Sequence, residues 1–419
     1  MSEKLTNTIK KHKRKFLFAI AFVFGIAAIG RLVKICGRDV FNDFNAYYDV
    51  VDAIVRGLNP YDLTNLNLKW VDPPIVFPGY TIFLLPFVLI NLNIAKYAFL
   101  FLNVILSSII FYSLFKKAGF INKPFDKNNL SFPGFLISLF AFMNSVPYLA
   151  CLKHGQISIV ISTCLIILFT LKKSWQKIIL FSVAAALKYS MLPLYAVLLF
   201  VKRKFFLCIA SFIVFILWAL IPIFFGHNLI VLYTEYLFTL HEQLVGGGFN
   251  SFAISGYNML QFDFIKIGWI CSIVKLSFAG AFVFVMIKNY KTKKIGLHLL
   301  LTVATITMII SYHRVYDMVF VLPLVLLLIN LYMKEKKWKH AGILSVFILF
   351  FLIPESLLFK ISNIIGSAIG ENSLIYLNSF GTYNEMFPIT PLITAILAIY
   401  SLYLFFTQID IYIFNKDIK

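Results

Sequence analysis

The chain has 419 residues, of which 60% are hydrophobic and only 13% are charged, and its formal net charge is +20. About a quarter of the residues in a soluble globular domain are charged, so this composition excludes an ordinary soluble protein and predicts a polytopic membrane protein. The basic residues stand in short clusters between long apolar runs, as in the cytoplasmic loops of membrane proteins, which argues against nucleic acid as a partner.

The N-terminal part predicts a basic cytoplasmic end followed by a first membrane span. Residues 10–15 are basic, and residues 16–33 form an apolar run as long as a membrane helix. We expect an uncleaved span rather than a signal peptide, because nothing after it resembles a soluble mature protein. Residues 34–92 then form a predicted first outer loop within a single integral membrane domain that covers residues 1–419.

The first outer loop contains a predicted amphipathic helix that lies flat at the bilayer surface. Its apolar face is formed by Phe44, Tyr47, Tyr48, Val51, Ile54 and Val55. Its polar face is formed by Asn45, Asp49, Asp52 and Arg56. Gly57 ends this helix, and residues 75–90, which prolines interrupt, predict a second interfacial or re-entrant helix.

The remaining apolar runs complete an all-α fold of about twelve membrane spans, with both chain ends in the cytoplasm. Single spans are expected near residues 93–115, 133–151, 157–171, 205–225, 266–287, 295–312, 316–332, 339–355 and 391–408. Residues 177–201 contain Lys188 and Pro193, which predict two short helices that meet at an outer turn. Most acidic residues then fall in outer segments, and most Lys and Arg residues fall on the inner side.

This topology brings the polar residues that interrupt apolar sequence to the outer side. They are Asp43, His154, Gln156, Lys188, the stretch 241–258 and the stretch 311–317. Several ionisable groups at one level indicate one shared cavity. An acid among cations suits a base that activates a hydroxyl and cations that neutralise a leaving phosphate. Because sugar nucleotides are cytoplasmic, an outer site of this kind predicts a lipid-linked phosphosugar as donor.

A set of motifs, taken in chain order, resembles glycosyltransferase family 87, whose members are GT-C-type membrane enzymes. The motifs are Asp43-Phe44 with Tyr47-Tyr48, Gly57-x-Asn59-Pro60-Tyr61, Pro73-Pro74, Gly155-Gln156, Ala186-Leu187-Lys188 with Pro193 and Lys202-Arg203-Lys204, and Tyr312-His313-Arg314-x-Tyr316-Asp317. The resemblance covers about residues 16–330 and leaves the part after residue 340 without a motif. It implies inverting transfer of a sugar, with mannose favoured, from polyprenyl phosphate to a hydroxyl of a glycolipid or glycan. The site is expected on the extracytoplasmic side of the plasma membrane.

The resemblance assigns the role of catalytic base to Asp43. Donor-phosphate binding is predicted for Lys188, His313 and Arg314. Contacts with the sugar or the acceptor are predicted for Tyr47, Tyr48, Asp72, His154, Gln156, His241 and Asn250. Many relatives have Tyr-Pro-Pro where this chain has Asp72-Pro73-Pro74, so an extra carboxylate is expected near the site. We expect no cofactor, and a divalent metal between Asp43 and Asp72 stays open as the less favoured alternative.

The same residues also have purely structural interpretations. Asp43 is suited to capping the predicted helix, Lys188 to reaching the interface along its apolar stem, and His313 with Arg314 to anchoring a helix end. His154 and Gln156 suit a turn, and His241 is expected on a mobile outer loop. At the level of function, the alternatives are a transporter or flippase of lipid-linked sugars and an inactive lipid-binding relative. A transporter predicts an internal repeat and polar groups near the membrane midplane, and the sequence shows neither.

Overall fold

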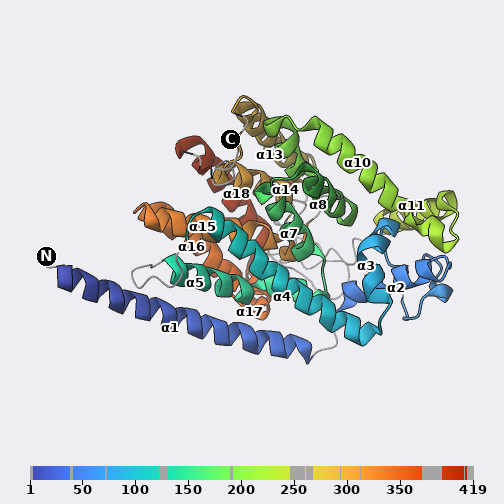
Figure 1. Cartoon of the computed structure of the whole chain (residues 1–419), viewed down its shortest axis with the longest axis horizontal. Coiled ribbons are helices and arrows are strands. Elements are labelled where there is room, and N and C mark those ends of the chain that lie inside the picture. Colours follow the sequence, from blue (N-terminus) through green and yellow to red (C-terminus); the bar gives the residue numbers. More distant parts are fainter. Residues whose placement is uncertain are drawn as a thin grey trace.

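The computed structural model describes residues 3–37, 41–70, 73–121, 131–188, 192–245, 260, 268–292, 294–311, 313–369, 389–409 and 411–412. Within these ranges the regular secondary structure is helical and contains no strand. Many of the long helices run in a similar direction, and α1 lies along one side of the bundle (Figure 1).

The helices follow the apolar runs of the sequence closely. Residues 3–201 form α1 (Glu3–Cys36), α2 (Asn42–Val55), η1 (Leu63–Asn65), η2 (Pro78–Tyr80), α3 (Thr81–Val88), α4 (Leu92–Lys117), α5 (Ser131–Asn144), α6 (Val146–His154), α7 (Ser158–Thr170), α8 (Ser174–Leu187), α9 (Leu192–Ala196) and η4 (Val197–Val201). Residues 205–407 form α10 (Phe205–Ala219), η5 (Ile221–Phe225), α11 (Leu229–Val245), α13 (Gly268–Tyr290), α14 (Leu297–Ile310), η6 (Val315–Val319), α15 (Val321–Lys334), α16 (Trp338–Leu352), α17 (Glu355–Ile369) and α18 (Ile389–Thr407).

The centre of the molecule is built from helices that are apolar on all sides. Nearly every residue of α14 and α15 is buried, and α7 is buried along most of its length. A helix that is hydrophobic all round belongs inside a bundle or a membrane. By contrast, α1, α10 and α13 expose large apolar side chains such as Phe22, Phe206 and Phe284, as helices that face lipid do.

The chain is a multi-pass membrane protein by the length and hydropathy of its helices. The described residues contain six helices that are long and apolar enough to cross a membrane, or eight if two bent helix pairs each count as one span. The expected spans 157–171 and 295–312 are instead the shorter helices α7 and α14. The expected number of about twelve spans is therefore not confirmed.

Several predicted elements change in detail. The expected span 133–151 is the pair α5 and α6, which bends by 53°, and α16 is followed by α17 at a bend of 96°, an element that the sequence patterns did not predict. The two short helices expected in residues 177–201 are confirmed as α8 and α9 with η4, and Lys188 ends the first of them. The prediction that His241 lies on a mobile loop is wrong, because it belongs to α11.

The predicted helix of the first outer loop is confirmed as α2, but protein covers both of its faces. Phe44 on its apolar face stacks on Phe99 of α4, with ring centroids 4.7 Å apart. On the face expected to be polar and exposed, Asp49 is buried. Its carboxylate accepts hydrogen bonds from the backbone of Asn67 and Leu68 and from the ring of Trp70, at 2.8–3.0 Å. A loop folded back onto Asp49 therefore replaces the water expected on this face.

Candidate active site

The turn between α6 and α7 determines how closely α2 approaches the bundle. Gly155 ends α6 in the left-handed region at φ 68°, and the N–H of Gln156 donates to the carbonyl of Cys151 at 2.9 Å, which closes the helix end. A Cβ on Gly155 would lie 2.5 Å from Cβ of Phe44. Only glycine satisfies both the backbone angle and this contact. The turn therefore sets Gln156 directly against the start of α2.

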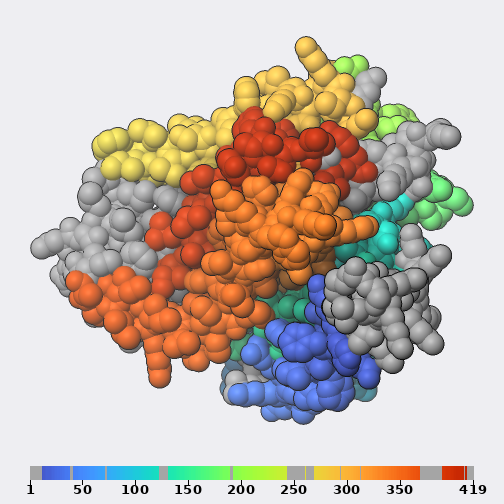
Figure 2. Space-filling view, turned by 90° about the vertical axis from the view of Figure 1, so that its left-hand side faces the viewer, coloured from blue at the N-terminus to red at the C-terminus, as the bar shows by residue number. Residues whose placement is uncertain are grey.

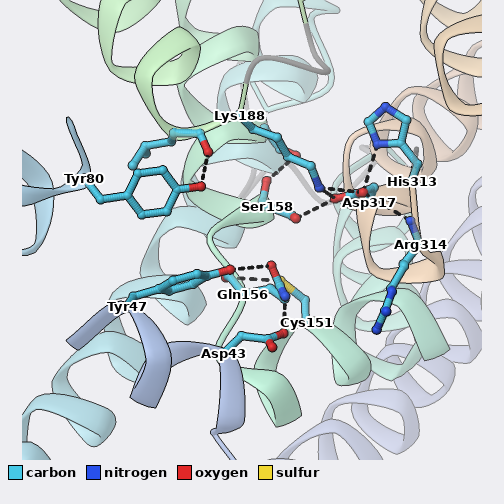
Figure 3. A network of polar contacts seen from close by, with 12 residues as sticks. Asp43, Tyr47, Tyr80, Cys151, Gln156, Ser158, Lys188, His313, Arg314 and Asp317 are labelled. Atoms are coloured by element: carbon cyan, nitrogen blue, oxygen red, sulfur yellow. Dashed lines mark hydrogen bonds and ion pairs between the residues drawn. The ribbon is translucent and has the colours of Figure 1, made fainter. Parts of the chain in front are cut away.

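Gln156 links Asp43 and Tyr47 of α2 in one chain of hydrogen bonds (Figure 3). Its Nε2 donates to Oδ2 of Asp43, and the hydroxyl of Tyr47 donates to its Oε1 at 3.0 Å. Asp43 and Tyr47 are four residues apart, so they share a helix face. Gln156 is buried and Asp43 is half-buried. Gln156 thus orients the Asp43 carboxylate, and hydrogen bonds at both the nitrogen and the oxygen of its amide hold Gln156 itself in place.

Asp43 does not cap α2. The N-cap position is Phe41, which has no side-chain cap hydrogen bond, and the Asp43 carboxylate receives its hydrogen bond from Gln156 on a different element. The first turn of the helix still favours a negative charge at this position through its dipole. The capping interpretation of Asp43 is therefore wrong, and its carboxylate points to the turn between α6 and α7.

Burial raises the pKa of the Asp43 carboxyl above its ordinary value. The positive field of His154, the hydrogen bond from Gln156 and the charges of Arg314 and Lys188 oppose this shift without cancelling it. A raised pKa makes the carboxylate a stronger base, as general-base catalysis near neutral pH requires. The same cations would also attract an anionic substrate to the site.

A second cluster is organised by Asp317 on η6, which is fully buried. Its carboxylate accepts hydrogen bonds from Nζ of Lys188 at 2.5 and 2.6 Å and from the hydroxyl of Ser158 at 2.6 Å. Nδ1 of His313 lies 2.9 Å from the same carboxylate. A buried carboxylate is costly unless it is paired and hydrogen-bonded, and these three partners satisfy it. Asp317 therefore holds two of the three predicted phosphate-binding residues.

The backbone of Arg314 is held by Asp317, whereas its side chain points away from Asp317. Its N–H donates to Oδ2 of Asp317 at 3.3 Å. The guanidinium extends away from Asp317 and runs down to the level of Asp43 and Gln156 (Figure 3). The charge of Arg314 acts on the Asp43 carboxyl, which agrees with this direction. Arg314 thus connects the Asp317 cluster with the Asp43 cluster.

Two sets of neighbouring residues connect the Asp43 cluster with the Asp317 cluster. Gln156, which binds Asp43, and Ser158, which binds Asp317, stand two residues apart at the same turn. The ring of Tyr80 packs against Tyr47, with centroids 5.5 Å apart, and its hydroxyl donates to the carbonyl of Leu187, directly before Lys188. The Asp43 and Asp317 clusters therefore form one connected polar network at one end of the bundle.

The other predicted site residues have different outcomes. His154 ends α6 and acts electrostatically on Asp43. The hydroxyl of Tyr48 donates to the carbonyl of Ile90 at 2.8 Å instead, because neighbouring residues of a helix point in different directions. His241 is exposed on α11 and makes no hydrogen bond to the network among the described residues. The predicted contacts Asp72 and Asn250 lie outside the described residues.

A metal site would need several ligands close together. Across the described ranges, no group of three or more His, Cys, Asp or Glu side chains is placed to hold an ion. The carboxylate pair considered for a metal includes Asp72, which the described ranges omit.

The sequence patterns missed the organising roles of Asp317, Ser158 and Tyr80. Asp317 follows His313 by four residues, the spacing at which side chains meet on a helical turn, so part of this signal was present. Ser158 follows two residues after Gln156 at the start of an apolar helix, which is the only hint of its role. The hydrogen bond of Tyr80 spans 107 positions and has no local signal.

Comparison with known proteins gives one match. The family model of Glycosyltransferase family 87 matches residues 77–311, more than half of the chain. Gln156, Ser158 and Lys188 fall inside the matched stretch, whereas Asp43 precedes it and Arg314 follows it. No curated protein matches the chain, and no solved structure matches it.

Proposed function

The chain belongs to glycosyltransferase family 87, and from this premise we propose that it is an inverting, GT-C-type enzyme that uses a polyprenyl-phosphate sugar as donor. Its acceptor is a hydroxyl of a glycolipid or glycan, and mannose is the favoured sugar by family resemblance. The proposed site faces the extracytoplasmic side of the plasma membrane, and both chain termini are cytoplasmic. Membrane lipids surround the bundle.

The observation that carries this proposal is the carboxylate of Asp43, which Gln156 orients and on which two cations from distant segments act. Lys188 and Arg314 both act on its charge, although they lie at the end of α8 and before η6. A base beside cations is the arrangement that a hydroxyl attack with a phosphate leaving group needs. A sheltered, half-buried position also keeps competing water away from the reacting sugar.

In the proposed step, Asp43 accepts the proton of the acceptor hydroxyl. The hydroxyl oxygen attacks the anomeric carbon from the face opposite the phosphate and forms the new glycosidic bond. The bond between that carbon and the phosphate oxygen breaks, and its electron pair leaves with polyprenyl phosphate. Attack from the opposite face inverts the configuration at the anomeric carbon. The charge that develops on the leaving phosphate requires a cation close to it.

Arg314 is the favoured phosphate ligand, because its guanidinium extends toward Asp43 while its backbone is held by Asp317. A guanidinium binds phosphate oxygens through two parallel hydrogen bonds. Lys188 and His313 share the charge of Asp317, so their pull on a phosphate is weaker in this geometry. They supply positive potential around the phosphate and hold Arg314 in place through the shared carboxylate.

Purified protein supplied with labelled polyprenyl-phosphate mannose and a panel of glycolipid acceptors tests this proposal. We expect release of polyprenyl phosphate coupled to a glycosylated product. Asp43→Asn should lose about a hundred- to ten-thousand-fold in rate, the usual worth of a general base. Asp52→Asn is the matched control, because Asp52 lies on the same helix and pairs with Arg56 outside the network.

Two outcomes would overturn the proposal. Transfer by Asp43→Asn at the rate of the control variant would remove the base from the mechanism. Movement of the lipid-linked sugar across liposomes, without release of polyprenyl phosphate or formation of product, would favour a flippase in its place.

A further inference from the structure

A basic hollow of about 560 Å³ lies between the ends of several helices. Its lining includes six cationic side chains, those of Lys117, Lys172, Lys177, Lys202, Arg203 and Lys204. None of the described residues that line it is acidic. A concave surface that carries one sign of charge concentrates ions of the opposite sign, so this hollow attracts anions.

The hollow lies at the end of the bundle opposite Asp43. α10 starts beside the hollow at Phe205, and η5 at its far end packs against α2. The 15 residues of α10 alone span about 22 Å at the rise of an α-helix. α7 gives the same result, because Ser158 at its start binds Asp317 and Thr170 at its end lines the hollow. The hollow is therefore separate from the proposed active site.

Figure 2 looks onto the end of the molecule where α1 begins. The end of α1 lies at the lower edge, α16 and α18 occupy the middle, and the segments coloured teal to light green gather at the right-hand edge. Apart from Ile295, the residues that line the hollow belong to the part of the chain between the end of α4 and the start of α10, which the colour bar shows from teal to light green. Clustered basic residues identify the cytoplasmic side of a membrane protein, so the hollow is expected to face the inner leaflet.

Several cations of the hollow lie close enough to repel one another. Burial lowers the pKa of the Lys202 ammonium, and the charges of Lys177 and Lys204 lower it further. Lys177 and Lys202 are both half-buried, so solvent screens their repulsion only in part. An anion bound among them would replace this repulsion with attraction.

An apolar groove of about 270 Å³ adjoins the basic hollow. Phe200, Phe282 and Met286 line the groove together with Tyr290. The guanidinium of Arg203, which lines the hollow, lies 4.4 Å from the centroid of the Tyr290 ring. The basic hollow and the apolar groove therefore meet at this pair of side chains.

Two further features surround the same place. Arg203 has a φ of 51°, a left-handed conformation that residues other than glycine rarely adopt. Its guanidinium lies between the hollow and the groove, beside the Tyr290 ring. Phe206 lines the hollow and is 78% exposed, as expected of a side chain that faces acyl chains. The apolar groove and the exposed Phe206 would contribute nothing to the binding of a soluble anion.

From these contacts we propose that the hollow and the groove together bind one anionic phospholipid of the adjacent leaflet. The phosphate group lies among the six cations, and an acyl chain follows the groove past Tyr290. Basic pockets between membrane helices on the cytoplasmic side suit anionic lipid headgroups. This site does not depend on the proposed transfer reaction, because it involves none of the residues of the Asp43 and Asp317 clusters.

Thermal unfolding of the full purified chain in detergent tests the proposal. Phosphatidylglycerol, phosphatidylcholine and inorganic phosphate are titrated separately against the wild type and two double variants. The test variant is Lys172→Gln with Lys204→Gln, two exposed side chains of the hollow. The control is Lys336→Gln with Lys339→Gln, two exposed lysines in and beside the connection between α15 and α16. Both variants lose the same charge.

We expect phosphatidylglycerol to raise the unfolding midpoint of the wild type and the control by a similar amount. The test variant should need about tenfold more of this lipid for the same shift, since each lost cation near a lipid surface weakens attraction. Phosphatidylcholine should leave all three midpoints unchanged, and inorganic phosphate should give a smaller shift than phosphatidylglycerol, because it makes no contact with the apolar groove. An equal response of test and control variants would overturn the proposal, and so would a shift with inorganic phosphate as large as that with phosphatidylglycerol.

Discussion

At the scale of single residues, the candidate site depends on two carboxylates with opposite surroundings. Asp43 is half-buried, receives a hydrogen bond from Gln156 and lacks a direct ion pair in the described structure. Asp317 is fully buried and pairs directly with Lys188 and His313. An acid with few compensating contacts is available for proton transfer, whereas a fully compensated acid is fixed as an anion. Their environments therefore assign different roles to two residues of the same type.

The raised pKa of Asp43 predicts how activity depends on pH. The carboxylate is the active form, so kcat/KM should rise with pH until the pKa of Asp43 is passed, above the ordinary aspartate value of about 3.9. Gln156→Leu removes a hydrogen bond that lowers this pKa and should move the acid limb to higher pH. Profiles of kcat/KM against pH for wild type and Gln156→Leu measure this shift. Tyr48→Phe is the control, because the Tyr48 hydroxyl binds a carbonyl outside the network. An unmoved acid limb in Gln156→Leu would contradict the prediction.

The pairing of Lys188 with Asp317 predicts strong coupling in stability. Lys188→Met removes the lysine partner of the buried Asp317 carboxylate, and Asp317→Asn removes the carboxylate that balances the partly buried Lys188, each at a cost of about 3–5 kcal/mol. The double variant removes both charges and should be clearly less destabilised than the sum of the two. Denaturant or thermal unfolding of all four proteins measures the coupling. Simple additivity would show that the pair contributes no mutual stabilisation.

The same cycle separates structure from catalysis. If Lys188 acts on the donor phosphate, transfer activity should stay low in the double variant even where stability returns. If Lys188 only balances Asp317, activity should recover together with stability. The expected result is recovery of stability without recovery of activity, measured with polyprenyl-phosphate mannose on protein that has been checked for folding.

At the scale of elements, the turn between α6 and α7 joins the two clusters. Gly155 lets α2 contact this turn, Gln156 then reaches Asp43, and Ser158 reaches Asp317. All three residues lie within four positions of the chain, so a small displacement of the turn changes both clusters together. The short helices on either side of the turn hold it in place through buried apolar faces.

Gly155→Ala tests the role of this turn. A Cβ at a φ of 68° costs about 1–2 kcal/mol, and its clash with Phe44 adds to this by displacing α2. We expect lower stability and a loss of transfer activity greater than the loss of folded protein explains. Gly226→Ala is a matched control, because Gly226 has a φ of 84° with nothing within 4 Å of its added Cβ. Equal activity of the two folded variants would exclude a positioning role for Gly155.

At the scale of the whole molecule, the two groups of polar residues lie at opposite ends of the helix bundle. The Asp43 and Asp317 clusters gather beside α2 and α3, and the basic hollow gathers at the other ends of α4, α7 and α10. The buried helices α14 and α15 lie in the apolar centre of the molecule. This arrangement agrees with an outer site for a lipid-linked donor and a cationic inner surface.

Labelling of single cysteines in intact cells measures this sidedness. The five native cysteines are free thiols and are first replaced by alanine. Asp62→Cys, on an exposed turn after α2, should react with a membrane-impermeant maleimide in intact cells. Lys336→Cys, on the exposed connection after α15, should react only after the membrane is permeabilised. Labelling in the reverse order would place the proposed active site in the cytoplasm.

The sequence by itself determined the membrane class and most helix positions, and it named Asp43, Gln156, Lys188, His313 and Arg314 as candidate site residues, which stay a prediction. Apolar runs and charge clusters are local signals, because each helix must satisfy its own backbone in lipid. The break at Lys188 and the helix at 42–55 were therefore predictable from the local order of apolar and polar residues. The order of the motifs also indicated the family that the comparison then matched.

Only the tertiary structure decided how these residues combine. Asp317 became the partner of Lys188 across 129 positions of the chain, and Asp49 was buried by a loop that the helix pattern could not reveal. The hydrogen bond between Gln156 and Asp43 exists because Gly155 lets two helices touch. Ion pairs and hydrogen bonds form between groups close in space, and packing sets which distant segments become neighbours. Periodicity along one helix carries no information on that choice.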